Sequence, residues 1–222
     1  MYDELAAYYH LIFENWDASI ARQAGVLGPP IETACGKNPA RILDAACGIG
    51  TQAVGLARRG HTVTGSDLSQ TADNAFAHLP SEHDLRQAVA SAARKLDRGG
   101  ILLATMRNYD MLARERPTFH GPAFYEGDGG RRRIVHQVWD WTGERRYTMH
   151  LYITRETAAG WETHHFTAAF HAVPRAMVTG ALEAAGFSAV RWMEPAESGY
   201  YQLIVLARLA RLPSPACSPI TP

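Results

Sequence analysis

The sequence has few cysteines, no net charge and no long apolar run. Its 222 residues include three cysteines, and this sparse, odd number excludes a disulfide scaffold and is typical of a reducing compartment. The acidic N-terminus lacks the basic and apolar segments of a signal peptide, and the apolar run at 203–207 is too short to cross a bilayer. We therefore expect a soluble, cytoplasmic protein.

The charge is balanced, with 22 basic and 22 acidic residues. Such a chain has no global electrostatic attraction to nucleic acids or anionic membranes, so we expect neither as a partner. The basic run Arg131-Arg132-Arg133 lies beside glycines and is predicted to be a solvated turn. His164 and His165 point to opposite faces of a predicted strand, and no histidine spacing predicts a metal site.

Strands and helices alternate over the first half of the chain. Short apolar strands are predicted at 41–46, 61–66 and 101–105, and helices at 2–28, 51–59 and 81–96. The segment Gly28-Pro29-Pro30 is expected to end the first helix. This alternation predicts an α/β fold with a mostly parallel, Rossmann-like sheet.

The pattern changes after residue 105. Strand-like runs joined by short turns are predicted at 133–141, 147–155 and 161–173. They indicate an antiparallel β insertion at about 111–172, a lid or substrate subdomain within a domain of residues 1–210. A last helix from Pro174 and closing strands complete this domain, and the proline-rich residues 211–222 are expected to be a disordered tail.

A glycine turn follows the first predicted strand. Gly48 and Gly50 permit a tight turn and the close approach of a ligand, and Asp67, at the end of the next strand, can accept from both ribose hydroxyls of an adenosine. Asp44 precedes the turn, and its charge would repel a pyrophosphate but not the ammonium and sulfonium groups of S-adenosylmethionine (AdoMet). The pattern favours AdoMet, although Gly48-x-Gly50-x-x-Ala53 also fits a weak dinucleotide fingerprint. A purely local role for Asp44 in holding the turn is the alternative.

Two further segments accompany this turn. Residues 73–80 read Asp-Asn-Ala-Phe-Ala-His-Leu-Pro, and residues 106–110 read Met-Arg-Asn-Tyr-Asp directly after the strand at 101–105. With the Asp-x-x-Cys-Gly-x-Gly pattern at 44–50, they resemble class I AdoMet-dependent methyltransferases, and in particular the glycine and sarcosine N-methyltransferase group. The resemblance covers most of residues 1–208. It implies a Rossmann-like sheet with an antiparallel last strand, AdoMet as cofactor and a small-molecule methyl acceptor.

The resemblance also implies roles for individual residues. The residues that match Asn74 and His78 line the cofactor and substrate pocket in that group, and the one that matches Arg107 holds the substrate carboxylate. A guanidinium can hold a carboxylate bidentately, whereas a structural ion pair between Arg107 and Asp110 is the alternative. We expect Arg107, His78 and Tyr109 around the reacting groups. The predicted cofactor contacts are Asp44, Ala45, Gly48, Gly50, Asp67, Leu68, Asn74 and His78.

The expected reaction, methyl transfer from AdoMet, depends mainly on how the protein positions the acceptor. Methyl transfer requires the acceptor's lone pair to be held in line with the methyl group, and a neutral amine needs no dedicated base. The expected acceptor is the amine of glycine, sarcosine or a similar amino acid. An O- or C-methyltransferase acting on another metabolite and a non-catalytic deletion product stay open as alternatives, as does a homo-oligomer.

The stretch after Asp67 is too short for the fold that the resemblance implies. Five residues, 68–72, separate Asp67 from Asp73, whereas a parallel crossover needs at least about 10–12 residues and the strand leading to Asp73 about five more. The resemblance implies a helix, a strand and a further crossover here, and all of these are missing between Gln70 and Thr71. Either the sequence omits residues or the protein carries an internal deletion. We favour omission, because a deletion would expose a sheet edge.

Overall fold

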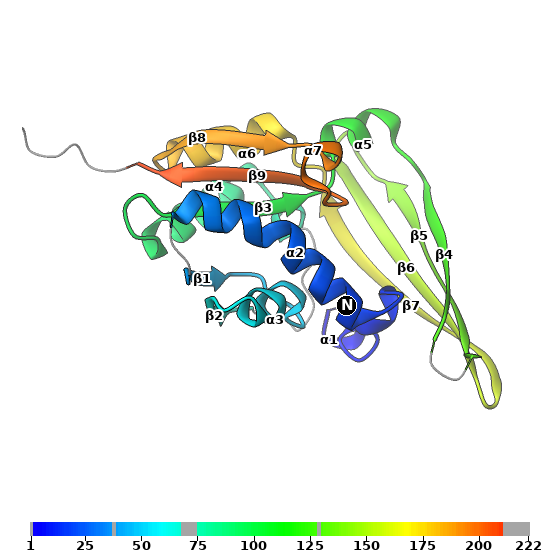
Figure 1. The fold of residues 1–222 in the computed structure, drawn as a ribbon. Coiled ribbons are helices and arrows are strands. Elements are labelled where there is room, and N and C mark those ends of the chain that lie inside the picture. Colours follow the sequence, from blue (N-terminus) through cyan, green and yellow to red (C-terminus); the bar gives the residue numbers. More distant parts are fainter. Residues whose placement is uncertain (1, 37–38, 68–74, 128–129, 211–222) are drawn as a thin grey trace, which may run out of the picture.

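The computed structural model describes residues 2–36, 39–67, 75–127 and 130–210. They form an α/β body with a separate antiparallel sheet beside it (Figure 1). The strands of the body are β1 (Arg41–Asp44) paired with β2 (Thr62–Gly65), and β3 (Ile101–Met106), β9 (Leu203–Leu209) and β8 (Phe187–Met193) in that spatial order. The separate sheet, called the outer sheet below, has the order β4 (Phe119–Glu126), β5 (Arg132–Trp141), β6 (Arg146–Thr157) and β7 (Gly160–His171).

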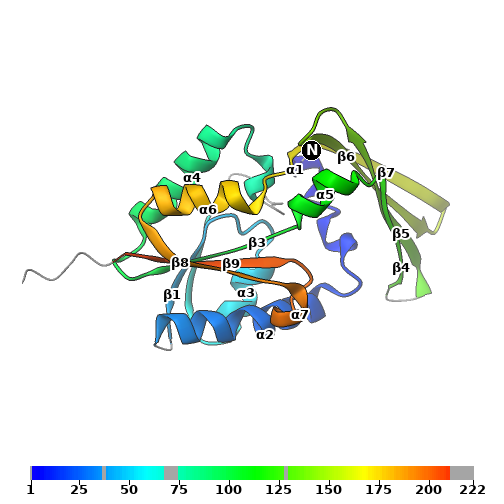
Figure 2. The ribbon, with the colours of Figure 1, turned by 90° about the horizontal axis from the view of Figure 1, so that it is seen from above.

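Helices cover both faces of the three-stranded sheet (Figure 2). Helices α4 (Glu82–Lys95) and α6 (Arg175–Ala184) pack together on one face, and α2 (Trp16–Cys35) lies on the other with α3 (Thr51–Arg58) against it. The shorter helices are α1 (Tyr2–Leu5), η1 (Tyr9–Ile12), η2 (Ala75–His78), α5 (Tyr109–Glu115) and α7 (Pro195–Ser198). Within the described ranges, no helix is both long enough and apolar enough to cross a membrane.

Strand β9 is the centre of the three-stranded sheet. It runs antiparallel to both β3 and β8, which confirms the prediction of an antiparallel last strand. Leu203, Ile204 and Val205 are fully buried in it, because helices cover both faces of the sheet. An apolar strand of this kind is stable only when both of its faces are covered.

Helix α2 does not end where the sequence predicts. It runs through Pro29 and Pro30 to Cys35, although each proline removes a backbone donor from the helix. Leu27 and Ile31 are buried on either side of the two prolines, in an apolar cluster with residues of α3 and β9. Packing therefore outweighs the two lost hydrogen bonds. Residues 2–15, predicted as part of the same helix, instead form α1, η1 and a loop.

The sheet of the body is split between β1 and β3. No ladder joins these two strands among the described residues, although both point in the same direction (Figure 1). Strand β1 is correspondingly poorly covered, and its Leu43 is 44% exposed. An open side on each strand is what the short segment after Asp67 leads us to expect. Gln70 and Thr71, and the tail at 211–222, lie outside the described residues.

The outer sheet contains the predicted antiparallel meander as β5, β6 and β7, with the added strand β4. Gly121 and Pro122 interrupt β4 and accompany a shift of register between His120 and Ala123, which is why the sequence did not indicate a strand there. The strand tolerates this interruption because it lies at the edge of the sheet.

The basic run Arg131-Arg132-Arg133, whose last two residues begin β5, is not simply a solvated turn. Arg132 is exposed and pairs with Glu156, but the neighbouring Arg133 is only 9% exposed. Consecutive strand residues point to opposite faces, so Arg132 faces solvent and Arg133 faces the interior. The prediction was wrong for Arg133.

Candidate functional site

The glycine turn between β1 and α3 has the predicted tight geometry. Gly48 and Gly50 have φ values of +52° and +84°, in the left-handed region that favours glycine. The Gly50 amide donates to the carbonyl of Cys47 at 2.7 Å, and Gly50 caps the N-terminus of α3. The turn therefore presents backbone rather than side chain at the ends of β1 and β2.

Asp67 reaches this turn from the end of β2. Its Oδ2 accepts a hydrogen bond from the backbone N–H of Gly48 at 2.8 Å, while the side chain remains exposed. A carboxylate has about four acceptor positions, so holding the turn leaves capacity for ligand hydroxyls. The structure thus places Asp67 beside the glycines and gives it a local role in addition to the predicted one.

Asp44 ends β1 directly below the turn. Burial raises the pKa of this carboxyl, and the negative charge of Asp67 raises it further, while the backbone N–H groups of Ala46 and Ala53 oppose the shift. Its Oδ2 is buried and has no hydrogen-bond partner among the described residues. A buried acceptor in this state is unfavourable by about 1–3 kcal/mol, and a cationic donor would satisfy it best.

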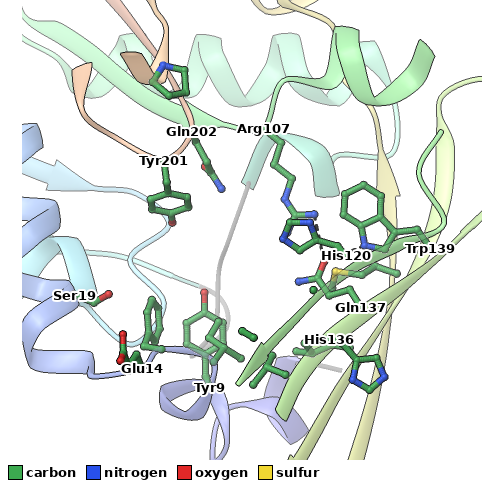
Figure 3. Close-up of a pocket in the computed structure, with 18 of the residues that line it drawn as sticks. Tyr9, Glu14, Ser19, Arg107, His120, His136, Gln137, Trp139, Tyr201 and Gln202 are labelled. Carbon is green, nitrogen blue, oxygen red and sulfur yellow. Dashed lines mark hydrogen bonds between the residues drawn. The ribbon is translucent and has the colours of Figure 1, made fainter. Parts of the chain in front are cut away.

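A cavity of about 800 Å³ lies between the body and the outer sheet (Figure 3). Its walls come from the N-terminal segment, the start of α2, the residues after β3, the outer sheet and the loop before β9. The labelled side chains include Tyr9, Glu14, Ser19, Arg107, His120, Gln137, Trp139, Tyr201 and Gln202. The wall formed by the outer sheet is mainly aliphatic and aromatic and carries a small group of polar side chains, as in many small-molecule sites.

Arg107 leaves the end of β3 and points into this cavity (Figure 3). Its guanidinium lies 4.9 Å from the ring centroid of Trp139, and its Nη1 is 3.5 Å from Oε1 of Gln137. Asp110, the alternative partner, accepts from the backbone N–H of Arg175 at 3.3 Å and forms an ion pair with its side chain. Asp110 is thus paired with Arg175, and the role of Arg107 toward a ligand stays a prediction.

His120 is an ionisable group that lines the same wall as Arg107. Burial lowers the pKa of its imidazole, and the positive charge of Arg107 lowers it further. Its ring stacks on Trp139 with 6.1 Å between centroids. The lowered pKa favours the neutral imidazole, which can accept a hydrogen bond from a bound molecule.

The structure separates the predicted residues into three groups. Asp44, Ala45, Gly48, Gly50 and Asp67 gather at the ends of β1 and β2, and Arg107 lies in the cavity. His78 packs against Phe170 with ring centroids 4.2 Å apart, and Tyr109 is 1% exposed in the core. Neither is among the described residues that line the cavity. Leu68 and Asn74 lie outside the described residues.

Sequence reasoning missed His120 and Gln137. The signal for Gln137 was present, since strict alternation in β5 places it between Val135 and Trp139 on the buried face. A polar side chain at such a position needs a partner, and here it accepts from Trp139 Nε1 at 3.0 Å. His120 gave no signal, because β4 itself was not predicted.

No protein-family model and no curated protein matches the chain, but solved structures do. CalS10, an amino pentose methyltransferase from Micromonospora echinaspora solved with AdoMet bound, is 19% identical with a TM-score of 0.67, over 92% of this chain and 95% of that one. DesVI from Streptomyces venezuelae is 17% identical with a TM-score of 0.66, over 85% and 91%. The sugar N-methyltransferase KedS8 from Streptoalloteichus is 14% identical with a TM-score of 0.65, over 86% and 88%. These likenesses show that the chain has the Rossmann-like fold of class I methyltransferases, as predicted.

Proposed function

We propose that this protein transfers a methyl group from AdoMet to a small molecule bound in the cavity. The observation that carries the proposal is the buried Oδ2 of Asp44 beneath the glycine turn, which has no hydrogen-bond partner within the part of the chain that the structure describes. A dinucleotide would bring a pyrophosphate to this turn, against the charges of Asp44 and Asp67. AdoMet brings an ammonium group, which is the donor that the Asp44 oxygen lacks.

The residues of the turn fit AdoMet in three ways. Asp44 would accept from its ammonium group, Asp67 would accept from its ribose hydroxyls, and the glycine backbone would allow its close approach. When bound, AdoMet supplies an electrophilic methyl group on a positively charged sulfur. The remaining task of the chain is to hold the acceptor in line with that methyl group and to exclude water.

The cavity wall of Arg107, His120 and Gln137 would orient the acceptor. Arg107 can bind a carboxylate bidentately, and the neutral His120 can receive the proton of an acceptor's ammonium or hydroxyl group. For an amino acid such as glycine or sarcosine, the carboxylate on Arg107 would direct the nitrogen toward the methyl donor. This acceptor class follows from the resemblance at residues 106–110.

A second acceptor class is an amino sugar. A cavity of about 800 Å³ is far larger than glycine requires, since cavities of about 300–1,000 Å³ hold drug-sized ligands. CalS10 and KedS8 are described as methyltransferases of an amino pentose and a sugar nitrogen. Sarcosine and an amino pentose are therefore the two acceptors to compare, by release of S-adenosylhomocysteine.

Calorimetric titration with AdoMet tests the cofactor assignment. The wild-type chain should bind AdoMet, and Asp44→Ala should bind it at least about 10-fold more weakly, because a charged hydrogen bond contributes about 1.5–3 kcal/mol. Asp97→Ala is the matched control, since Asp97 is an exposed acid in an ion pair with Arg41. A folded wild-type chain that does not bind AdoMet would contradict the proposal and support the non-catalytic alternative.

A further inference from the structure

The N-terminal residues 8–16, called the strap below, run along the cavity between the outer sheet and α3. The strap contains η1, the loop before α2 and Trp16, the first residue of α2, and it supplies part of the cavity wall. Its cavity-lining residues are Tyr9, Ile12, Phe13, Glu14 and Asn15. The position of the strap therefore sets the shape of the cavity.

Arg133 holds the strap to the outer sheet. Its Nε donates to the carbonyl of Leu11 at 2.9 Å, and its Nη2 donates to the carbonyls of Phe13 and Glu14 at 2.5 and 2.9 Å. The guanidinium also stacks over the ring of Tyr125 at 5.0 Å. One buried side chain thus binds three carbonyls of the strap, one in η1 and two in the loop that follows it.

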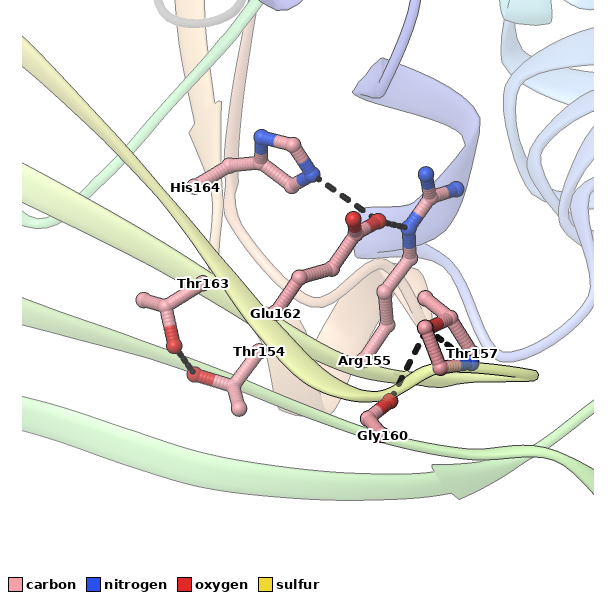
Figure 4. Close-up of polar contacts among 8 residues, drawn as sticks. Thr154, Arg155, Thr157, Gly160, Glu162, Thr163 and His164 are labelled. Atoms are coloured by element: carbon pink, nitrogen blue, oxygen red, sulfur yellow. Dashed lines mark hydrogen bonds and ion pairs between the residues drawn. The ribbon is translucent and has the colours of Figure 1, made fainter.

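A second contact fixes the beginning of the strap. The ring of Tyr8 lies 5.4 Å from the guanidinium of Arg155 and 4.0 Å from the ring of His164. Glu162 accepts from both of these side chains and holds them in place, as Figure 4 shows. The outer sheet therefore contacts the strap at two points, through Arg133 and through Arg155 with His164.

The end of the strap contacts the cofactor side of the molecule. Nε1 of Trp16 donates to Oγ1 of Thr51 at 3.0 Å. Thr51 is buried and is the first residue of α3, directly after the glycine turn. The strap thus connects the outer sheet, the cavity and the glycine turn within nine residues of chain.

We propose that Arg133 is a positioning residue for the acceptor cavity, which it shapes by fixing the strap, and that the Trp16–Thr51 contact transmits binding at the glycine turn to the strap. The role of Arg133 in fixing the strap does not depend on the proposed function. The identity of the molecules bound in the cavity and at the glycine turn rests on it. A guanidinium suits the positioning role because its planar fork reaches several carbonyls at once. Neither Arg133 nor Trp16 is expected to touch the reacting atoms.

Hydrogen exchange of the strap tests the first part. The amides of Leu11 and Phe13 bond to carbonyls within the strap, so their exchange reports its local opening. Arg133→Met should speed their exchange at least about 10-fold, since charged hydrogen bonds are lost. Arg132→Met is the matched control, because it removes the same charge from the opposite face. Arg133→Lys should give an intermediate rate. Equal exchange rates of the strap amides in Arg133→Met and Arg132→Met would overturn the proposal. An acceleration of exchange in Arg133→Met that is equal throughout the chain would also overturn it.

The second part uses a milder change, which also serves if Arg133→Met does not fold. AdoMet should slow exchange at Leu11 and Phe13 in the wild type, and Trp16→Phe should abolish this slowing while AdoMet still binds in the calorimeter. Slowing that persists in Trp16→Phe would overturn the coupling. A wild-type chain that binds no AdoMet would instead overturn the proposed function, while the comparison of Arg133→Met with Arg132→Met would still decide the role of Arg133.

A kinetic comparison separates positioning from general destabilisation. With sarcosine or the amino pentose, whichever the wild type methylates, Arg133→Met should raise the acceptor KM at least about 10-fold. Its kcat should change less than about twofold, because Arg133 contacts no reacting group, whereas its affinity for AdoMet should fall only as far as the coupling between the strap and the glycine turn requires. An unchanged acceptor KM would overturn the positioning role.

Discussion

The outer sheet and the β1–β2 ladder hold the two halves of the candidate site by different means. The outer sheet has strands of 8 to 12 residues joined by short turns, and its aromatic residues stack on one another, as Tyr147 does on Trp139 and Phe170. The β1–β2 ladder has four residues in each strand and leaves Leu43 44% exposed. The outer sheet is stabilised by neighbours close in sequence, whereas β1 depends on elements that are distant in sequence.

The largest expected difference is in the free energy of unfolding, between truncation of a buried side chain in the outer sheet and truncation of an exposed side chain in β1. Ile153 in β6 is 0% exposed, and Ile153→Ala should lower the free energy of unfolding by about 2–5 kcal/mol. Leu43→Ala in β1 should lower it by less than about 1 kcal/mol, because the side chain is only partly buried. Chemical denaturation of both variants measures these values. An equal cost for the two would show that further chain covers β1.

The comparison also explains which parts of the fold the sequence revealed. Strands β5, β6 and β7 were predictable because alternation and turn residues are local signals. The passage of α2 through Pro29 and Pro30 was not predictable, because the burial of Leu27 and Ile31 against α3 and β9 is set by tertiary packing. The split beside β1 was predictable in kind, since chain length alone limits what residues 68–72 can form.

Asp67 tests the β1–β2 side of the site. Asp67→Ala should weaken AdoMet binding about 10- to 100-fold, because ribose hydroxyls lose a charged acceptor that is worth about 1.5–3 kcal/mol. Asp67→Asn keeps an acceptor for the Gly48 amide and should lose less. Titration calorimetry on both variants separates binding from support of the turn. Unchanged affinity in a folded Asp67→Ala variant would remove this residue from the cofactor site.

Arg107 provides the corresponding test on the cavity side. Arg107→Lys keeps the charge but loses the planar fork, so kcat/KM for an amino-acid acceptor should fall more than about 10-fold with AdoMet binding nearly intact. Discrimination against acceptors without a carboxylate should weaken in the same variant. Unchanged sarcosine methylation, or a wild-type preference for the amino pentose, would contradict the amino-acid assignment. Methyl transfer itself would stand in either case.

The candidate site was predictable where chemistry follows a short motif. Asp44, Gly48, Gly50 and Asp67 were found because a turn between a strand and a helix is a local feature. Arg133 was misjudged because its partners, the carbonyls of the strap, are more than a hundred residues away in the sequence. No spacing rule reports a side chain that binds the backbone of a distant loop.

Acidification should change the stability of the outer sheet and of the β1–β2 ladder in opposite directions. This is the smallest of the expected effects. Burial is the main cause that lowers the pKa of His10 in the strap and of His120 and His171 in the outer sheet. Below the ordinary value of 6.5 the unfolded chain therefore binds more protons than the folded one at these positions, and their contribution to stability falls as the pH falls. Burial raises the pKa of Asp44 above 3.8, so protonation of Asp44 favours the folded state as the pH decreases.

Hydrogen exchange measured between pH 7.5 and 5.5, corrected for the intrinsic rate of exchange, tests the contribution of the histidines. In this range the histidines dominate, and protection in the strap and the outer sheet should fall more than protection in β1 and β2. Replacing His10, His120 and His171 together by Gln should flatten the pH dependence of the outer sheet, whereas replacing the exposed His83 of α4 by Gln should leave it unchanged. If both regions lost protection equally in the wild type, the histidines would not be the cause, because all three lie on the side of the strap and the outer sheet.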